Sequence, residues 1–396
     1  MRAKRTKKAS RKREAPTKRM ADSTVIKSLR LRNFLSFGPN SEAVPLGPLN
    51  ILIGRNGSGK SNFLHAFGIL QSIPTDVSGY LRGGNTFNEW FWKSEKASDG
   101  FTFEVDLNLT PLGSPDKEAR YELTVREYEG SPEIAEQFTS GREQADTESI
   151  RDLFGADDRR RWRTLSILAH AQAFEDRVAS QAVSKAFDSI ELLRDFTFGT
   201  RSPVRQPQRS DLPRHRLLED GSNLGLILNG LRQAPVAKQR FLDELNRLYD
   251  GISDFDVRIF EGLVQVTVQE GDLTIPATRL SDGTLRYLSM LAVLCTPKPP
   301  PIICIEEPEL GLHPDILPSI ARLLVDASQR SQIIVTTHSD ILVDALSDHP
   351  KAVLVCDKEE DRTFMMKLEP EKLKVWLKTY RLGSLWLSGE IGGTRW

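Results

Sequence analysis

The stretch Gly54-Arg55-Asn56-Gly57-Ser58-Gly59-Lys60-Ser61 decides the fold of this chain. The short apolar run 49–53 precedes it and predicts a buried strand. Apolar residues at three-to-four spacing over 63–70 follow it and predict a helix that ends before Pro74. Glycines in such a turn let successive backbone N–H groups face inward, and the helix N-terminus adds its positive dipole end. The strand, the turn and the helix therefore predict a phosphate-binding loop.

The pattern G-x-x-x-x-G-K-[ST] assigns a role to each polar position of this loop. We expect Lys60 to reach the β- and γ-phosphates of ATP and to take part in catalysis, and Ser61 to bind Mg²⁺. A chance match in a glycine-rich turn is the alternative, and the flanking strand and helix argue against it. The loop residues expected to bind the nucleotide are Asn56, Gly57, Ser58, Gly59, Lys60 and Ser61.

A second apolar run, 301–305, ends in the acidic pair Glu306-Glu307, as a Walker B strand does. We expect Glu306 to hold Mg²⁺ or its water and Glu307 to orient and deprotonate the attacking water. The first acid of such a pair is usually Asp, so Glu306 departs from the pattern by one methylene. An exposed acidic strand end without a catalytic role is the plain alternative.

The sequence Leu280-Ser281-Asp282-Gly283-Thr284 precedes another apolar helical run and resembles an L-S-G-G-Q signature. It predicts a second phosphate-binding helix N-terminus, with Ser281 supplying a hydroxyl and Gly283 an N–H. Ser-Asp-Gly alone is as often an N-cap and a turn. Because we place this segment on a different lobe from the phosphate loop, we expect it to serve the nucleotide of a partner head.

The apolar run 332–336 predicts a further strand, and it leads into Thr337 and His338. His338 lies where a switch histidine would contact the γ-phosphate. A lone histidine is more often structural, but here four motifs follow one another in the expected order, and chance matches would have to coincide.

The rest of the chain predicts an α/β fold of the P-loop NTPase type. Alternation over 101–109 and 121–128 predicts an antiparallel layer, and the unalternating apolar runs predict a mixed central sheet buried on both faces. The predicted segments are a disordered basic tail, 1–20; the first half of the ATPase lobe, 21–128; an inserted, mostly helical lobe ending in the signature, 129–289; and the second half of the ATPase lobe, 290–396.

Charge is distributed unevenly although the formal net charge is zero. Residues 1–20 hold ten Lys/Arg and one Glu, a net +9, which leaves −9 for the remainder. Such a segment cannot bury enough apolar surface to order itself, so we expect disorder. A nucleic-acid-binding arm is one interpretation; a tail without function and a true start at Met20 are the others.

Composition also narrows the function classes. No apolar run approaches the roughly 18 residues that a membrane span needs, so we expect no membrane partner and a cytoplasmic location. The three cysteines form no C-x-x-C pair, which argues against a disulfide framework or a zinc site. No sustained heptad occurs, so no long coiled-coil arm is expected.

These motifs together resemble the ABC-type heads of the RecF/SMC superfamily, and in particular the small stand-alone predicted ATPases of the RecF-like AAA class. The resemblance covers about 22–396, including Leu31-Arg32-Asn33-Phe34, Asp220-Gly221-Ser222-Asn223-Leu224 and the glycine-rich ending 380–396. It implies that Arg32 and Asn33 flank the nucleotide, and that ATP and Mg²⁺ are held between two heads of a homodimer. A Q-loop cannot be assigned; 82–84 is only a candidate.

Several functions fit the resemblance. An ATP-dependent dimerising ATPase of DNA repair or phage defence, acting through DNA or a partner protein, is favoured. A regulatory ATPase subunit controlling a separately encoded nuclease or toxin is the alternative, since only 58 residues follow His338, too few for a Toprim nuclease domain. A transporter subunit is disfavoured because 221 residues separate Ser281 from Lys60. A binding module without catalysis is disfavoured because every catalytic position is filled.

Overall fold

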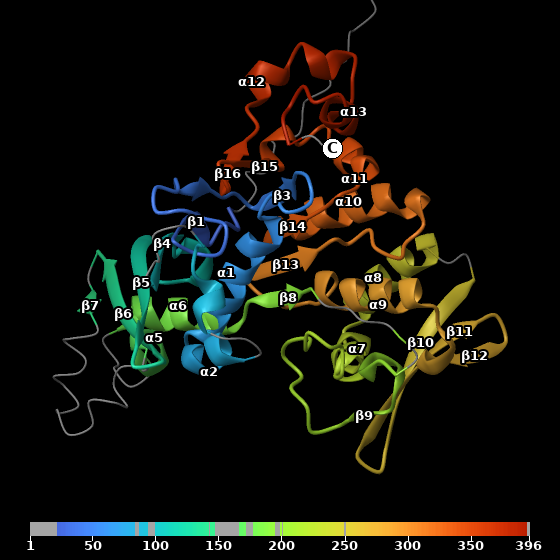
Figure 1. The fold of residues 1–396 in the computed structure, drawn as a ribbon. Helices are drawn as coiled ribbons and strands as arrows, with labels where there is room; N and C mark the ends of the chain where they lie inside the picture. The colour runs from blue at the N-terminus through green and yellow to red at the C-terminus, as the bar shows by residue number, and fades with distance from the viewer. Residues whose placement is uncertain are drawn as a thin grey trace, which may run out of the picture.

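The computed structural model describes residues 22–83, 87–93, 100–141, 143–146, 166–171, 177–194, 199, 201–248 and 251–393. The expected basic tail, 1–20, and the part of the expected insertion over 147–160 lie outside these residues. Three sheets organise the described chain (Figure 1). Figure 1 shows the central sheet between an antiparallel sheet on one side and a lobe with the third sheet on the other.

The central sheet carries the predicted motifs, and its strand order is β16-β15-β3-β14-β13-β8. Strands β8, β13, β14, β3 and β15 are parallel, and β16 is antiparallel to β15. Strand bounds are β3 Leu49–Ile53, β8 Glu191–Leu193, β13 Ile302–Glu306, β14 Gln332–Thr336, β15 Val353–Glu359 and β16 Arg362–Lys367. The predicted mixed, doubly covered sheet is confirmed.

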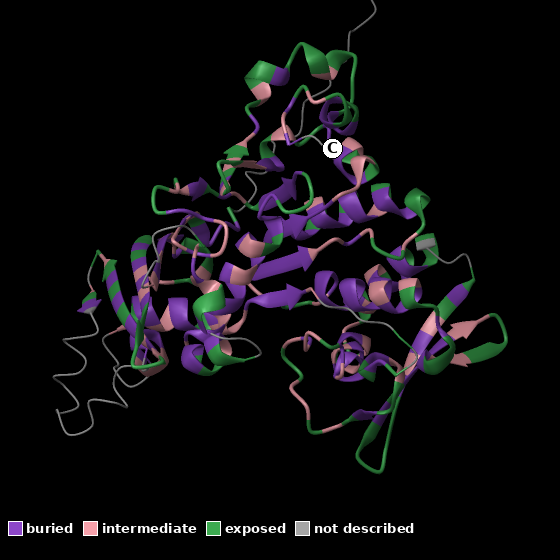
Figure 2. Cartoon of the chain, viewed as in Figure 1, coloured by how far each residue is buried: buried purple, intermediate pink, exposed green. Residues whose placement is uncertain are grey.

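Both faces of this sheet are buried, which explains the apolar runs without alternation (Figure 2). In β13, Ile302 and Cys304 pack into the core shared with α1 (Lys60–Ser72), whereas Ile303 and Ile305 pack into the opposite core. That second core contains α9 (Asp282–Leu294) and α10 (Leu317–Ala327). The strand ends that carry the motifs are thus held rigidly from both sides.

A six-stranded antiparallel sheet covers the α1 side, in the order β2-β1-β4-β5-β6-β7. Its buried face contributes aromatic residues to the α1 core, for example Phe101, Phe103 and Phe138. Strand bounds are β1 Ile26–Arg32, β2 Val44–Pro45, β4 Gly100–Asn108, β5 Glu118–Tyr128, β6 Ser131–Ser140 and β7 Gln144–Asp146. Helices α2 (Val77–Arg82), α5 (Ile167–His170) and α6 (Val178–Asp188) join this core.

The lobe on the other side combines helices with a third antiparallel sheet. Helices α7 (Leu224–Arg232) and α8 (Pro235–Leu248) pack with α9 against β10 (Ile252–Phe260) and β11 (Leu263–Glu270). Strands β9 (Gln208–Arg209) and β12 (Leu273–Pro276) pair with β11. Figure 1 shows the β10–β11 hairpin extending away from the central sheet.

The structure divides the interval 129–289 differently from the single, mostly helical lobe expected. Strands β6 and β7 extend the antiparallel sheet, α6 packs on the α1 core, and β8 joins the central sheet. The lobe that remains combines α7, α8 and α9 with an antiparallel sheet.

One buried side chain explains why β6 lacked a visible strand pattern. Glu136 points inward between Ile134 and Phe138, where an apolar residue would mark the alternation. Its carboxyl accepts hydrogen bonds from the Tyr121 hydroxyl and, at 2.6 Å, from the backbone N–H of Ile167, and burial raises its pKa. A buried polar group satisfied in this way is stable in a core, but it is not visible from hydropathy.

The C-terminal part of the chain forms the β15–β16 edge of the central sheet and the helices that follow it. Helix α11 (Asp340–Ala345) follows β14, and α12 (Pro370–Leu373) and α13 (Leu382–Leu387) follow β16. The Trp386 indole is fully buried and donates a hydrogen bond of 2.6 Å to the carbonyl of Gly393. Within the described residues, no helix combines the length and the apolar character needed to cross a membrane.

Candidate functional site

The loop between β3 and α1 has the backbone of a phosphate cradle. Gly54 has φ +151° and Gly59 φ +99°, values that side chains disfavour. A Cβ at either position would lie 2.2 Å from a neighbouring oxygen, the Cys356 carbonyl or the Thr363 hydroxyl. Only glycine fits there. Residues 55–57 between them are exposed, so their backbone is open to a ligand.

Lys60 lies folded over this loop. Its Nζ donates to the carbonyls of Gly54 at 2.8 Å and Arg55 at 3.0 Å, and the residue is 4% exposed. Burial lowers the pKa of Lys60, whereas Cys356 and the nearby glutamates oppose that shift. The hydroxyl of Ser58 is buried in the loop without a hydrogen-bond partner among the described residues. A cationic donor and an unused hydroxyl therefore both belong to the buried part of this loop.

Ser61 and Glu306 meet although 245 residues separate them. The Ser61 Oγ donates a 2.5 Å hydrogen bond to the Glu306 Oε1. The contact arises because α1 starts at the carboxyl end of β3 and Glu306 ends β13, one strand beyond the intervening β14. A hydroxyl beside a carboxylate at this edge is the donor set that Mg²⁺ takes together with phosphates and waters.

Glu307 and His338 form the other close pair. Their Oε1 and Nε2 atoms lie 3.5 Å apart, and both side chains are about one quarter exposed. Glu307 has φ +45°, an uncommon angle for a residue with a side chain, and its N–H donates to the Thr336 carbonyl at 3.0 Å. The turn directs the carboxylate of Glu307 away from the line of β13 and toward the end of β14.

The surroundings of Glu307 favour its protonated form. Burial, followed by the charges of Glu309 and Glu306, raises the pKa of this carboxyl, while Lys60 and Arg286 lower it. Perturbed carboxyls in clefts are common among proton-transfer groups.

Glu309 is a site residue that the motif analysis missed as such. Its Oε1 accepts hydrogen bonds from the Thr337 hydroxyl at 2.8 Å and the His338 N–H at 2.7 Å. It therefore ties the segment after β13 to the segment after β14. The acidic run 306–309 was the available signal, but which of its members faces the histidine depends on the turn at Glu307.

The signature segment begins α9. Ser281 is the N-cap, and its Oγ accepts a hydrogen bond from the Thr284 N–H at 3.1 Å. Gly283 packs so closely on the chain after β13 that a Cβ would lie 2.4 Å from the Gly311 carbonyl. No hydrogen bond or ion pair of Ser281 reaches 54–61 within the described chain.

Arg286 links the signature helix to the acidic pair. From the second turn of α9, its Nη2 donates to the carbonyls of Glu306 at 3.2 Å and Glu307 at 3.1 Å. No sequence motif marks Arg286, because its partners are backbone atoms distant in sequence.

Arg32 and Asn33 do not touch the phosphate loop by a hydrogen bond or ion pair. The Arg32 guanidinium pairs with Glu104, and the Asn33 carbonyl accepts from the Trp92 N–H at 2.8 Å. The turn that follows them does reach it. The Ser36 Oγ accepts a hydrogen bond from Asn62 of α1 at 2.8 Å and is hydrogen-bonded to the Thr363 hydroxyl at 2.7 Å.

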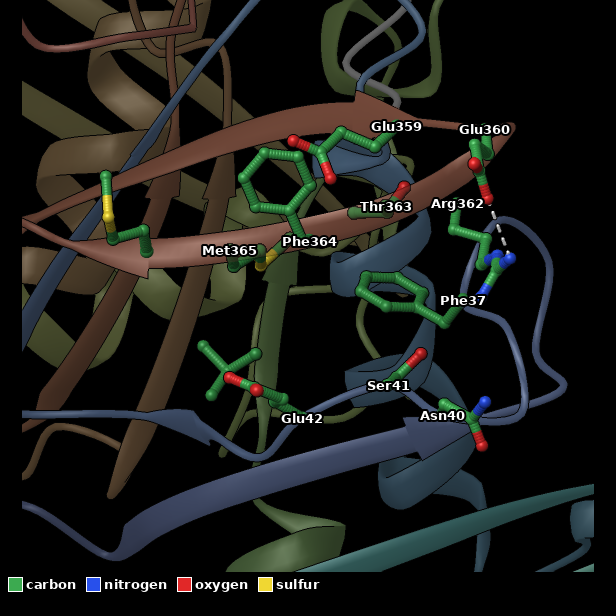
Figure 3. Close-up of a pocket in the computed structure, with 12 residues that line it drawn as sticks. Phe37, Asn40, Ser41, Glu42, Glu359, Glu360, Arg362, Thr363, Phe364 and Met365 are labelled. Carbon is green, nitrogen blue, oxygen red and sulfur yellow. Dashed lines mark hydrogen bonds and ion pairs between the residues drawn. The ribbon is translucent and has the colours of Figure 1, made fainter.

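A groove of about 800 Å³ adjoins this turn (Figure 3). Figure 3 shows Phe37 and Ser41 on the loop after β1, and Thr363 and Met365 on β16. The Thr363 hydroxyl also donates to the Ser58 carbonyl at 2.9 Å, so the groove begins at the phosphate loop. It lies on the β15–β16 side, opposite the side that holds Glu307 and His338.

A metal site made by protein side chains alone is absent: among the described residues, no group of three or more His, Cys, Asp or Glu could hold an ion. This fits Mg²⁺, which is usually bound through one or two protein ligands together with substrate phosphates and waters.

Comparison with solved structures shows the same fold. An Smc head bound to the C-terminal winged-helix domain of ScpA superposes with a TM-score of 0.59 at 16% identity, covering 88% of this chain and 99% of that one. Smc heads from Pyrococcus furiosus and Pyrococcus yayanosii give TM-scores of 0.57 and 0.53 at 15% and 13% identity. They cover 89% of this chain each and 98% and 99% of their own.

Sequence comparison assigns the family. No curated protein matches the chain. Residues 49–344, which span all four motifs, match the family described as "AAA domain, putative AbiEii toxin, Type IV TA system". The chain is a member of this AAA-domain family, with the P-loop fold of an SMC/RecF-like ABC-type ATPase head.

Proposed function

We propose that the chain is an ATPase of the RecF/SMC class that dimerises on binding ATP and separates after hydrolysis. In this cycle it acts on DNA or on a partner protein, in DNA repair or in defence against phage. Two heads hold each nucleotide between the phosphate loop of one chain and the Ser281 segment of the other.

The proposal rests on one observation. The residues at the edge of the central sheet contact one another, whereas, within the described residues, the Ser281 segment stands without such contacts to the phosphate loop. Ser61–Glu306 and Glu307–His338 gather at one edge of the central sheet, beside Lys60. Ser281 and Gly283 lie beyond β13, capped and packed but making no hydrogen bond or ion pair to 54–61 in the described chain. Such a helix N-terminus, with backbone N–H groups and a hydroxyl, suits phosphate binding from outside the chain.

The residues at the edge divide the hydrolytic work between them. Glu307 orients a water and takes its proton, because its raised pKa makes it a better base than an ordinary carboxylate. Lys60 leaves the carbonyls of its own loop to reach the phosphates, and His338 contacts the terminal phosphate. Ser281 of the second head meets the developing charge from the other side.

Mg-ATP fits the residues present. The cradle needs the glycines found at 54 and 59, Ser58 has an unused buried hydroxyl, and Ser61 with Glu306 would hold Mg²⁺. Mg²⁺ would supply charge neutralisation on the phosphates. With the reactive end toward Glu307, the groove between the loop after β1 and β16 lies where the nucleoside would extend.

The test is Glu307→Gln, which keeps the side-chain shape and removes the base. We expect phosphate release to fall by about 10²–10⁴-fold and ATP to trap a dimer, measured by light scattering after gel filtration. Glu118→Gln, an exposed glutamate on β5, is the matched control and should behave like wild type. A variant that hydrolyses ATP normally, or wild type that stays monomeric with Mg-ATP, contradicts the proposal.

The description of the family favours a second candidate, a regulatory ATPase paired with a separately encoded toxin or nuclease. Phosphate release measured with duplex DNA and with single-stranded DNA separates the two candidates. Stimulation of phosphate release by DNA supports direct action on DNA; an ATP-dependent dimer indifferent to DNA supports control of a protein effector.

A further inference from the structure

The segment 367–381, which begins at the last residue of β16, carries a net positive charge. It contains five Lys/Arg and two Glu, a net +3, although the chain as a whole is neutral. Its basic residues are Lys367, Lys372, Lys374, Lys378 and Arg381. Figure 1 shows this segment at the end of the molecule opposite the β10–β11 hairpin.

Two aromatic side chains stand among these charges. Trp376 is 43% exposed and Tyr380 is 51% exposed. The turn that begins with the short 3-10 helix Trp376–Lys378 places both on one side, because the Tyr380 N–H donates to the Trp376 carbonyl at 2.9 Å. Their ring centroids are 6.0 Å apart and the rings are inclined by 43°. The two rings therefore form an open aromatic surface rather than a core contact.

The cations around these rings are only partly neutralised. Lys372 pairs with Glu369 at 2.7 Å, and Lys374 lies 3.9 Å from Glu371. Among the described residues, Lys378 and Arg381 make no ion pair. The surface thus keeps an excess of positive charge next to its exposed rings.

A pocket of about 360 Å³ opens beside Trp376. Its walls include the apolar residues Leu373, Leu385 and Ile391. Its charged lining residues are two lysines, Lys367 and Lys372, and two glutamates, Glu369 and Glu390. Ligand pockets typically measure roughly 300–1,000 Å³, so this one is large enough for a single flat ring system. Burial lowers the pKa of Lys367, and the neighbouring Lys351 lowers it further, so a bound anion would relieve the repulsion between these lysines.

We propose that Trp376, Tyr380 and the adjoining pocket bind single-stranded nucleic acid: unpaired bases stack on the rings, and Lys367, Lys378 and Arg381 contact the phosphates. Exposed aromatics in a cationic groove are the general arrangement for this ligand, because every base offers a flat face. A duplex hides those faces, so the surface prefers single strands. This specifies the DNA branch of the function proposed above, but the binding needs neither ATP nor a dimer.

A short segment of chain joins the pocket to the phosphate loop. Gly392 lines the pocket, and the next residue, Gly393, packs so that its Cβ position would lie 3.4 Å from the Gly54 Cα. A bound base is therefore separated from the start of the phosphate loop by one short segment.

The test uses the full chain without nucleotide and three fluorescent probes of equal length: a 20-mer of thymidine, its abasic counterpart and a duplex. Anisotropy should show about ten-fold tighter binding of the thymidine strand than of the abasic strand. Trp376→Ala combined with Tyr380→Ala should remove that preference, and Trp376→Phe should keep most of it. Lys378→Gln should weaken binding of all three probes alike, because it changes only phosphate contacts.

The abasic probe corrects for the basic segment 1–20, which would bind any polyanion. Phe260→Ala, at another exposed aromatic, controls for general surface effects, and thermal unfolding checks that each variant is folded. Equal affinity of wild type for the thymidine and abasic strands overturns the proposal. So does a double variant that keeps the preference, or one that changes only the oligomeric state of the chain, which would mark a protein contact. None of these results bears on ATP hydrolysis, so the two proposals fail separately.

Discussion

The edge of the central sheet and the start of α9 both present phosphate-binding groups, but only the first is complete within one chain. At the edge, side chains from two strand ends and one helix contact one another: Ser61 with Glu306, and Glu307 with His338. At α9, Ser281 caps its own helix, while Gly283 packs on Gly311 and Arg286 donates to the carbonyls of the acidic pair. The difference is what the proposed two-headed site requires: one chain supplies the reactive half and a second chain supplies the closing half.

Complementation between two inactive variants tests whether Ser281 completes the site of another chain. Ser281→Arg should remove hydrolysis to background while monomeric ATP binding stays within about two-fold of wild type, because Ser281 does not touch its own phosphate loop. Glu307→Gln should be equally inactive. Mixing the two should restore phosphate release, since one of the two sites then combines an intact Glu307 with an intact Ser281.

The controls are each variant alone at doubled concentration and a mixture of Ser281→Arg with wild type. No recovery in the mixture would mean that Ser281 serves its own nucleotide, or that the site does not lie between chains.

A smaller loss of hydrolysis is expected from changing Arg286, which joins α9 to the edge of the sheet. Arg286→Ala removes two hydrogen bonds to the carbonyls of Glu306 and Glu307, so the turn that aims the base loses its support. We expect hydrolysis to fall about ten-fold and stability to fall by about 1–3 kcal/mol, measured by phosphate release and urea unfolding. Arg286→Lys keeps the charge and should retain more activity. Unchanged hydrolysis in Arg286→Ala would show that the two regions work independently.

The smallest expected effect is a shift in the pH dependence of hydrolysis. Because the pKa of Glu307 is raised above the ordinary 4.5, the carboxyl becomes protonated, and hydrolysis declines, at a higher pH than for an exposed glutamate. Glu309→Gln removes a charge that raises this pKa, so the acid limb of the pH–rate profile should move to lower pH. Arg286→Ala removes a charge that lowers it and should move the limb to higher pH.

The two shifts are opposite in sign, which distinguishes them from a general loss of packing. Profiles that coincide with wild type would mean that another group limits the rate on the acid side.

Much of this edge was predictable from the sequence because the apolar runs show where the strands end. Parallel strands bring their carboxyl ends together, so apolar runs ending at Gly54, Glu306 and Thr336 imply that Ser61, Glu307 and His338 are neighbours. The antiparallel strands 101–109 and 121–128 alternated visibly and are confirmed as β4 and β5.

What could not be predicted depends on tertiary contacts. Glu309 faces His338 only because Glu307 adopts a left-handed turn, and Arg286 acts on carbonyls that no motif marks. Ser36 is hydrogen-bonded to Asn62 of α1. The residues expected to lie beside the nucleotide were Arg32 and Asn33, a few positions earlier in the chain. In each case the partner is chosen by backbone geometry rather than by residue type.

The position of β3 between β14 and β15 has a consequence for how the protein is made. Strand β3 is synthesised early, but both strands that flank it begin at residue 332 or later. At a typical synthesis rate of about 5–20 residues per second, the phosphate loop waits roughly 15–60 s for its neighbours. Throughout that interval the apolar strand 49–53 has no partner within its own sheet, so the newly made N-terminal half depends on the antiparallel sheet, or on a chaperone, to stay out of aggregates.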